Sequence, residues 1–108
     1  MTPEGKVKAA VDKILKSYGP ELDSFKPVQN GMGSPALDYI VCYRGHHIEI
    51  ETKADGKKPT PRQEVTIAKK KAAGAVVFVI DGDDGCTALD AYLQCVQARR
   101  FVNYNRGE

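Results

Sequence analysis

Two carboxylates and one ammonium group occupy alternate positions in residues 47–53, as Glu49, Glu51 and Lys53. The positions between them carry apolar or β-branched side chains: Ile48, Ile50 and Thr52. Strict alternation predicts a half-buried β-strand with the charged groups roughly 7 Å apart along one face. A carboxylate that can hold a divalent cation, followed two residues later by a lysine, suits phosphodiester cleavage. The same pattern is also typical of a solvated strand face.

A further carboxylate, Asp38, begins a predicted strand over residues 37–43. The dipeptide Arg44-Gly45 predicts a hairpin turn that places residues 37–38 beside residues 51–52. We therefore expect Asp38 and Glu51 to meet at one end of the sheet, next to Lys53. Two carboxylates suit Mg²⁺ or Mn²⁺, which can activate a bound water for attack on a phosphate. A nearby lysine can orient that water or take its proton.

Four segments carry a resemblance to a known family: Gly-Ser-Pro-Ala-Leu-Asp at 33–38, Glu-Thr-Lys-Ala at 51–54, Thr-Pro-Arg-Gln at 60–63 and Ala-Gly-Ala-Val-Val at 73–77. Together they resemble the PD-(D/E)xK nuclease superfamily, and within it the stand-alone, virus-type VRR-NUC domain. The resemblance covers about residues 4–82. Glu-x-Lys alone is a weak signal, whereas the four segments in this order are more specific. Ala36 and Leu37 separate Pro35 from Asp38, which departs from the family pattern.

The resemblance implies a role for each residue at the site. Asp38 and Glu51 would ligate the metal with the backbone carbonyl of Thr52, and Glu4 on the first helix would complete the set. Lys53 would be the catalytic lysine, supported by Gln63 on the following helix. Family members of this kind are homodimers that cut branched DNA, including four-way junctions. The resemblance also implies a phage origin.

Each of these residues also has a purely structural interpretation. Glu51 and Lys53 can form a surface ion pair worth less than about 1 kcal/mol. Gln63 can cap a helix together with Thr60, and it can do so while supporting the site. Glu4 suits the first turn of a helix, where it complements the dipole. Asp38 can be a strand-edge residue, and Glu49 is expected to be solvated or to support the site from outside it.

Basic residues cluster after the predicted site. Lys57, Lys58 and Arg62 are placed to hold a phosphate backbone. The run of lysines at 69–71 suits a helix C-terminus, and lysines 6, 8, 13 and 16 suit a solvated helix face. The tail at 99–108 combines basic and aromatic residues, and it can stack on nucleic acid or exchange onto a partner subunit. His46 and His47 are interpreted as turn residues, with DNA contact as the minor alternative.

The sequence predicts both helices and strands along the chain. Helices are expected from a Thr2 cap to Tyr18, from a Thr60 cap to Gly74 and from a Thr87 cap onward. Strands are expected at 24–29, 37–43, 47–53 and 75–80, the last covered on both faces. The order α-β-β-β-α-β-α predicts an α/β fold in which a mixed sheet is flanked by helices. The family resemblance implies that this fold is restriction-endonuclease-like. We expect one nuclease domain over residues 1–98.

Composition fits a small intracellular domain. The 108 residues have a net charge of only +2, so any affinity for nucleic acid must come from placement. Three cysteines without paired spacing favour a reducing cytoplasm, with Cys42 and Cys95 as core residues. No apolar run reaches the length of a membrane span.

Two rival functions fit parts of the sequence. The apolar strand followed by Asp81-Gly82-Asp83 is similar to the nucleophile loop of haloacid-dehalogenase phosphatases, but too few residues follow it. A non-catalytic DNA-binding or dimerisation module with a nuclease-like fold is the alternative. Intact Asp38, Glu51 and Lys53 favour the metal-dependent endonuclease.

Overall fold

The computed structural model describes residues 1–28 and 35–106. Its elements are, in order, α1 (Pro3–Ser17), β1 (Leu22–Phe25), β2 (Tyr39–Tyr43), β3 (His46–Thr52), α2 (Pro61–Ala72), β4 (Val76–Ile80) and α3 (Asp83–Ala98), with 3₁₀ turns at Gly19–Glu21 and Tyr104–Arg106. The sheet order is β1-β2-β3-β4. The first three strands are antiparallel and β4 lies parallel to β3, so α2 is the crossover. The predicted α/β fold and element order are confirmed.

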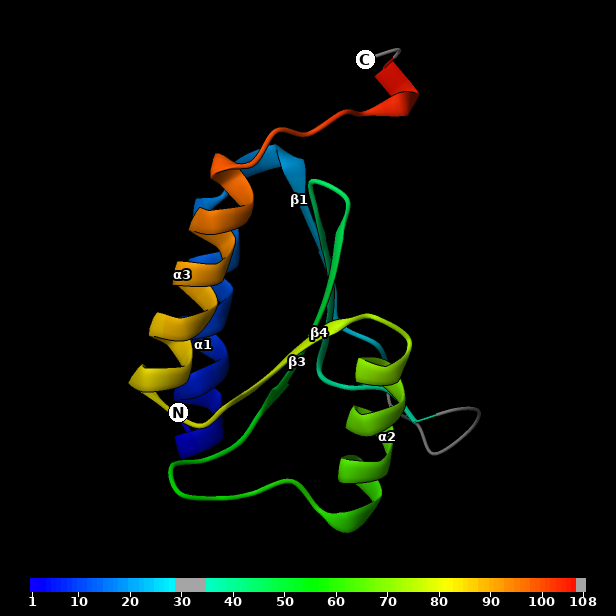
Figure 1. Cartoon of the computed structure of the whole chain (residues 1–108). Helices are drawn as coiled ribbons and strands as arrows, with labels where there is room; N and C mark the ends of the chain where they lie inside the picture. The colour runs from blue at the N-terminus through cyan, green and yellow to red at the C-terminus, as the bar shows by residue number, and fades with distance from the viewer. Residues whose placement is uncertain (29–34, 107–108) are drawn as a thin grey trace.

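Helices cover both faces of the sheet (Figure 1). α1 and α3 lie side by side on one face, and α2 lies alone on the other. The main core fills the layer between the sheet and the first pair, where Val11, Tyr39, Val41, Ile48 and Leu89 are fully buried. The α2 layer is smaller and covers the charged face of β3.

The hairpin between β2 and β3 fixes the register of the site. Arg44 and Gly45 have φ values of 49° and 82°, which suit a two-residue turn with both central residues in the left-handed region. Tyr39 pairs with Ile50, so the positions just before β2 lie opposite Glu51 and Thr52. The predicted hairpin and its pairing are therefore confirmed.

Two of the predicted helix starts are confirmed and one is wrong. Thr2 Oγ1 accepts from Gly5 N–H at 3.0 Å, and Thr60 forms a capping box with Gln63. α3, however, begins after Gly82 rather than at Thr87. Asp83 and Asp84 lie in its first turn, where their charges complement the helix dipole.

Several burial predictions are also wrong. Cys42 and Cys95 are exposed, because each points away from the core layer on its strand or helix. The apolar residues Val65 and Ile67 of α2 are both expected to face the sheet, but Ile67 is buried together with Thr66, whereas Val65 is 57% exposed. β4 is an edge strand, and its Val79 is 39% exposed rather than covered. β1 begins earlier than predicted, at Leu22, and ends before Pro27.

The composition of residues 30–35 predicts a loop, and residues 30–34 of this segment lie outside the described residues. Within the described ranges, no helix is both long enough and apolar enough to cross a membrane.

Candidate active site

Asp38 and Thr52 are joined at the end of the sheet. The Oδ2 atom of Asp38 accepts from the backbone N–H of Thr52 at 2.9 Å and from the Thr52 hydroxyl at 2.7 Å. Asp38 directly precedes β2, and Thr52 is the last residue of β3. The hairpin register therefore delivers the aspartate to the strand end, as the sequence predicted.

Glu51 lies across the hairpin from Asp38, faces the other side of β3 from Thr52 and contacts α2. Its Oε2 atom accepts from Gln63 Nε2 at 2.9 Å and lies 3.6 Å from Lys53 Nζ. The Oε1 atom of Gln63 meanwhile accepts from the Thr60 N–H at 3.0 Å. Gln63 therefore caps α2, as its structural interpretation predicts, and it also contacts the predicted site residue Glu51.

Burial changes the acidity of Glu51. The residue is only 4% exposed, and desolvation raises the pKa of its carboxyl. The negative charge of Asp38 raises this pKa further, while Lys53 and the backbone of Asp38 act in the opposite direction. The charge of Asp38 thus opposes the ionisation of Glu51, an arrangement common where a cation is to be bound.

Lys8 on α1 connects the first helix to the aspartate. Its Nζ donates to Glu4 Oε2 at 2.9 Å, to Thr52 Oγ1 at 2.7 Å and to Asp38 Oδ2 at 3.3 Å. Glu4 therefore reaches the site through this ammonium group. The assignment of Lys8 to a solvated face was wrong. One sequence signal did indicate the contact with Glu4: Lys8 follows it by four residues, the spacing at which side chains pair on a helix.

The donor set fits Mg²⁺ or Mn²⁺. Carboxylate oxygens from Asp38 and Glu51, with one backbone carbonyl and water, are the hard ligands that these ions accept. No group of three His, Cys, Asp or Glu side chains that could hold a metal occurs within the described ranges. A site here would accordingly rest on two carboxylates. This suits Mg²⁺, which commonly keeps several waters and binds through one or two carboxylates.

Glu49 is buried rather than solvated. It is 1% exposed, and its Oε2 lies 2.7 Å from His47 Nε2 and 3.6 Å from Lys70 Nζ. Its Oε1 is buried without a hydrogen-bond partner among the described residues. Of the two alternatives predicted for Glu49, the solvated one is wrong, because α2 covers this face of β3. His47 is exposed beside it, two positions before Glu49 on the same face.

The basic residues near the site are exposed. Lys57, Lys58 and Arg62 lie in the segment that links β3 to the first turn of α2. Lys69 and Lys71 are exposed at the other end of α2. The first group, but not the second, shares the end of the sheet that carries Lys53.

The tail packs against its own chain at the opposite end of the sheet. Arg44 donates to the Arg99 carbonyl at 2.8 Å, and its guanidinium lies 5.1 Å from the centre of the Phe101 ring. Arg99 Nη1 lies 3.1 Å from His46 Nε2. These contacts join the tail to the β2–β3 turn.

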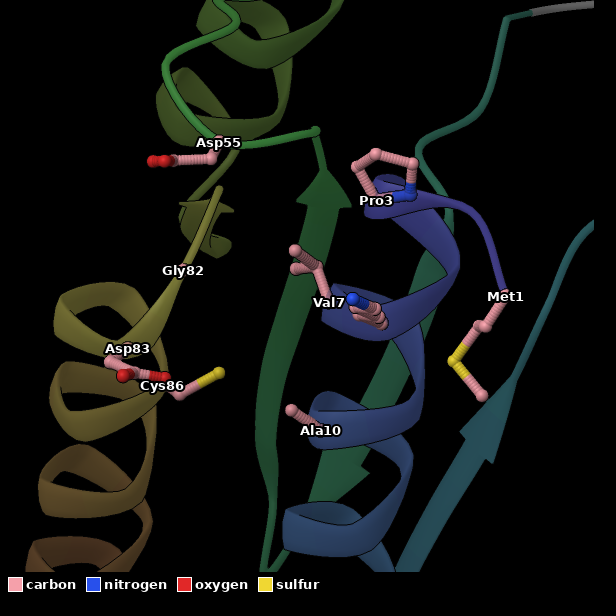
Figure 2. A pocket seen from close by; sticks show the side chains of 9 residues that line it. Met1, Pro3, Val7, Ala10, Asp55, Gly82, Asp83 and Cys86 are labelled. Atoms are coloured by element: carbon pink, nitrogen blue, oxygen red, sulfur yellow. The ribbon is translucent and has the colours of Figure 1, made fainter.

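A cavity of about 330 Å³ adjoins the site between the first turns of α1 and α3. Figure 2 shows Val7 and Ala10 on α1 pointing toward Cys86 on α3, with Asp55 near one end. Burial raises the pKa of the Cys86 thiol, and the charge of Asp83 adds to this effect. Neither Asp38 nor Glu51 lines the cavity, so it is a neighbour of the site and not part of it.

Comparison with known proteins agrees with this architecture. A solved structure described as a VRR_NUC domain matches with a TM-score of 0.73 and 26% sequence identity, over 85% of this chain and 98% of that one. No family model and no curated protein matches the chain. The predicted nuclease-like fold is confirmed. The chain therefore has a VRR-NUC domain, in line with its resemblance to the PD-(D/E)xK nucleases.

Proposed function

We propose that this chain is a metal-dependent endonuclease that hydrolyses phosphodiester bonds in DNA, with branched molecules such as four-way junctions as substrates. The supporting observation is the convergence of Asp38, Glu51 and Lys53 at one sheet end of a VRR-NUC fold. A solvated ion pair does not account for Glu51, which is buried and held from a second element by Gln63.

In this proposal Asp38, Glu51 and the Thr52 carbonyl hold Mg²⁺ or Mn²⁺, with Glu4 as a further acidic group nearby. When bound, such an ion would lower the pKa of a water ligand and would stabilise the charge that develops on the phosphate. Lys53, whose Nζ lies 3.6 Å from Glu51 Oε2, orients the attacking water or takes its proton. Gln63 fixes the Glu51 carboxylate by donating to Oε2.

The substrate preference and the assembly belong to the same proposal. Lys57, Lys58 and Arg62 would hold the DNA backbone beside the site, because all three are exposed there. Resolution of a branched molecule requires two cuts, and each chain supplies one site. A homodimer would therefore provide the pair.

The test is cleavage of labelled four-way junction, flap and linear duplex DNA with Mg²⁺ or Mn²⁺. Lys53→Ala is compared with Lys13→Ala, which removes the same charge from an exposed position on α1. We expect metal-dependent cutting of the junction that EDTA and Lys53→Ala abolish and Lys13→Ala retains. Binding without cleavage under either metal would instead favour the non-catalytic DNA-binding module.

A further inference from the structure

Among the described residues, all side-chain and backbone donors to the Asp38 carboxylate meet one of its two oxygens. Three donors converge on its Oδ2: the Thr52 N–H at 2.9 Å, the Thr52 hydroxyl at 2.7 Å and Lys8 Nζ at 3.3 Å. No hydrogen bond in the described part of the chain reaches Oδ1. The carboxylate therefore has one oxygen fixed by the protein and one oxygen available to a ligand.

Lys8 determines the direction in which the Thr52 hydroxyl donates. A lysine ammonium has donors and no acceptor, whereas a hydroxyl has one donor and accepting lone pairs. Because Lys8 donates to Thr52 Oγ1 at 2.7 Å, the hydroxyl oxygen is the acceptor in that contact. Its single hydrogen is then directed to Asp38 Oδ2. The result is a series of two hydrogen bonds, from Lys8 to the Thr52 hydroxyl and from that hydroxyl to Asp38.

We propose that Lys8 and the side chain of Thr52 are positioning residues for Asp38, which turn its Oδ1 toward the metal. This inference rests on the proposed function for the metal, and it gives a role at the site to two side chains that the sequence pattern does not single out. Groups that orient a metal ligand in this way typically contribute 10–100-fold to metal affinity or activity. Neither side chain touches the metal, the substrate or the reacting atoms in this scheme.

The surroundings of the two hydrogen bonds that link Lys8, Thr52 and Asp38 favour positioning over a surface ion pair. Thr52 is 1% exposed, and the Lys8 side chain is 35% exposed with contacts to three separate segments of the protein. A fixed donor in a poorly solvated position restricts the rotation of the carboxylate, which a freely hydrated lysine does not do.

Charge alone makes the opposite prediction for Lys8. Removing a cation that lies 3.3 Å from a ligand carboxylate should tighten the binding of a divalent ion. Loss of positioning should weaken that binding. The sign of the change in affinity therefore separates the two effects.

The test is a double-mutant cycle on Mn²⁺ affinity, measured by titration calorimetry on the DNA-free protein. The variants are Lys8→Met, Thr52→Val and the double variant, with Thr52→Ser to restore the hydroxyl and Lys13→Met as the matched charge control. We expect Thr52→Val to weaken Mn²⁺ binding about tenfold and Thr52→Ser to restore it. Lys8→Met should weaken binding in the wild-type background and weaken it less in the Thr52→Val background, where the direct contact of Lys8 with Asp38 at 3.3 Å remains.

Three results would overturn the inference. One is wild-type Mn²⁺ affinity in Thr52→Val, and another is tighter binding in Lys8→Met. If Thr52→Val does not fold in thermal melts, Lys8→Met still tests the inference, because its position is partly exposed. The direction of its change in Mn²⁺ affinity then decides between positioning and charge. Absence of Mn²⁺ binding by the wild-type protein is the third, and together with absent cleavage it would overturn the proposed function as well. Mn²⁺-dependent cleavage with unchanged affinity in the variants would overturn the positioning roles alone.

Discussion

Gln63 joins Glu51 to the start of α2. Its Nε2 donates to Glu51 Oε2 at 2.9 Å, while its Oε1 accepts from the N–H of Thr60 at 3.0 Å. The amide is suited to both contacts because it carries a donor and an acceptor on one planar group. Helix capping and carboxylate positioning are thus coupled through a single side chain.

Substitution can separate these two roles. Gln63→Glu keeps an acceptor for the Thr60 N–H but replaces the donor to Glu51 with a second carboxylate. We expect cleavage to fall at least tenfold, because Glu51 loses its positioning partner and gains a repulsive neighbour. Rates on junction DNA under saturating Mn²⁺ would measure the effect.

Thr60→Ala is the matched control, since it removes the hydroxyl cap and leaves the backbone donor to Gln63. It should lower the free energy of unfolding by about 1 kcal/mol in urea, with cleavage by the folded protein unchanged. Wild-type cleavage by Gln63→Glu would contradict a role for the amide donor at the site.

The alternation in β3 predicted the strand but not the environment of each face. Ile48 and Ile50 face the main core as expected, yet Glu49 and Glu51 are also buried. The period of two identifies which residues share a face, and the crossover helix decides whether that face meets water. α2 presents Gln63 and Lys70 to these carboxylates, so this layer is polar and its contacts have no simple apolar signature.

Burial of Glu49 yields a prediction for stability. Its carboxylate is 1% exposed and has one oxygen without a partner among the described residues, and its neighbours His47 and Lys70 both retain access to water. Glu49→Met removes the buried charge and leaves both neighbours in contact with water. The free energy of unfolding should therefore stay unchanged or rise by up to a few kcal/mol.

Urea unfolding at pH 7 measures this difference. Glu49→Asp serves as the comparison, because it retains the charge and shortens its reach, and it should be destabilising. A large loss of stability in Glu49→Met would mean that the contacts with His47 and Lys70 outweigh the desolvation of the carboxylate.

Lys8 and α3 show two further limits of the sequence. The spacing of apolar residues on α1 located the buried stripe of Val7, Val11 and Leu15 correctly. That spacing carries no information about Lys8, which lies at the border of the stripe. Its partners Asp38 and Thr52 lie 30 and 44 positions away in the sequence. Likewise, Thr87 has a typical capping side chain, but the chain leaves β4 and enters α3 already at Gly82.

The basic segment after β3 yields a prediction for DNA affinity. Lys57→Ala/Lys58→Ala should weaken junction binding and reduce the slope of log K against log salt by about 0.9 for each phosphate that the variant no longer neutralises. Fluorescence anisotropy in EDTA at several salt concentrations would measure binding without cleavage. Lys69→Ala/Lys71→Ala is the control, since it removes two exposed charges at the far end of α2. Equal effects in both double variants would indicate a general charge effect without a local DNA contact.

The raised pKa of Glu51 predicts how stability depends on pH in the metal-free protein. Burial and Asp38 raise this pKa above the ordinary value of 4.5, so the folded state binds more protons than the unfolded state between the two values. The contribution of Glu51 is fully present below pH 4.5 and is lost as the pH rises through the folded-state pKa. Ionised Glu51 therefore destabilises the metal-free fold at neutral pH.

Glu51→Gln isolates this contribution, because it keeps the shape and removes the titration. Urea unfolding in EDTA from about pH 4.5 to about pH 7.5 should show the wild-type protein losing stability relative to the variant as the pH rises. Added Mn²⁺ should stabilise the wild-type protein at about pH 7.5 and have little effect on the variant, since a ligand that binds only the folded state adds to its stability. A difference between the two proteins that stays constant with pH would contradict the shift. An equal response of both to Mn²⁺ would remove Glu51 from the proposed ligands.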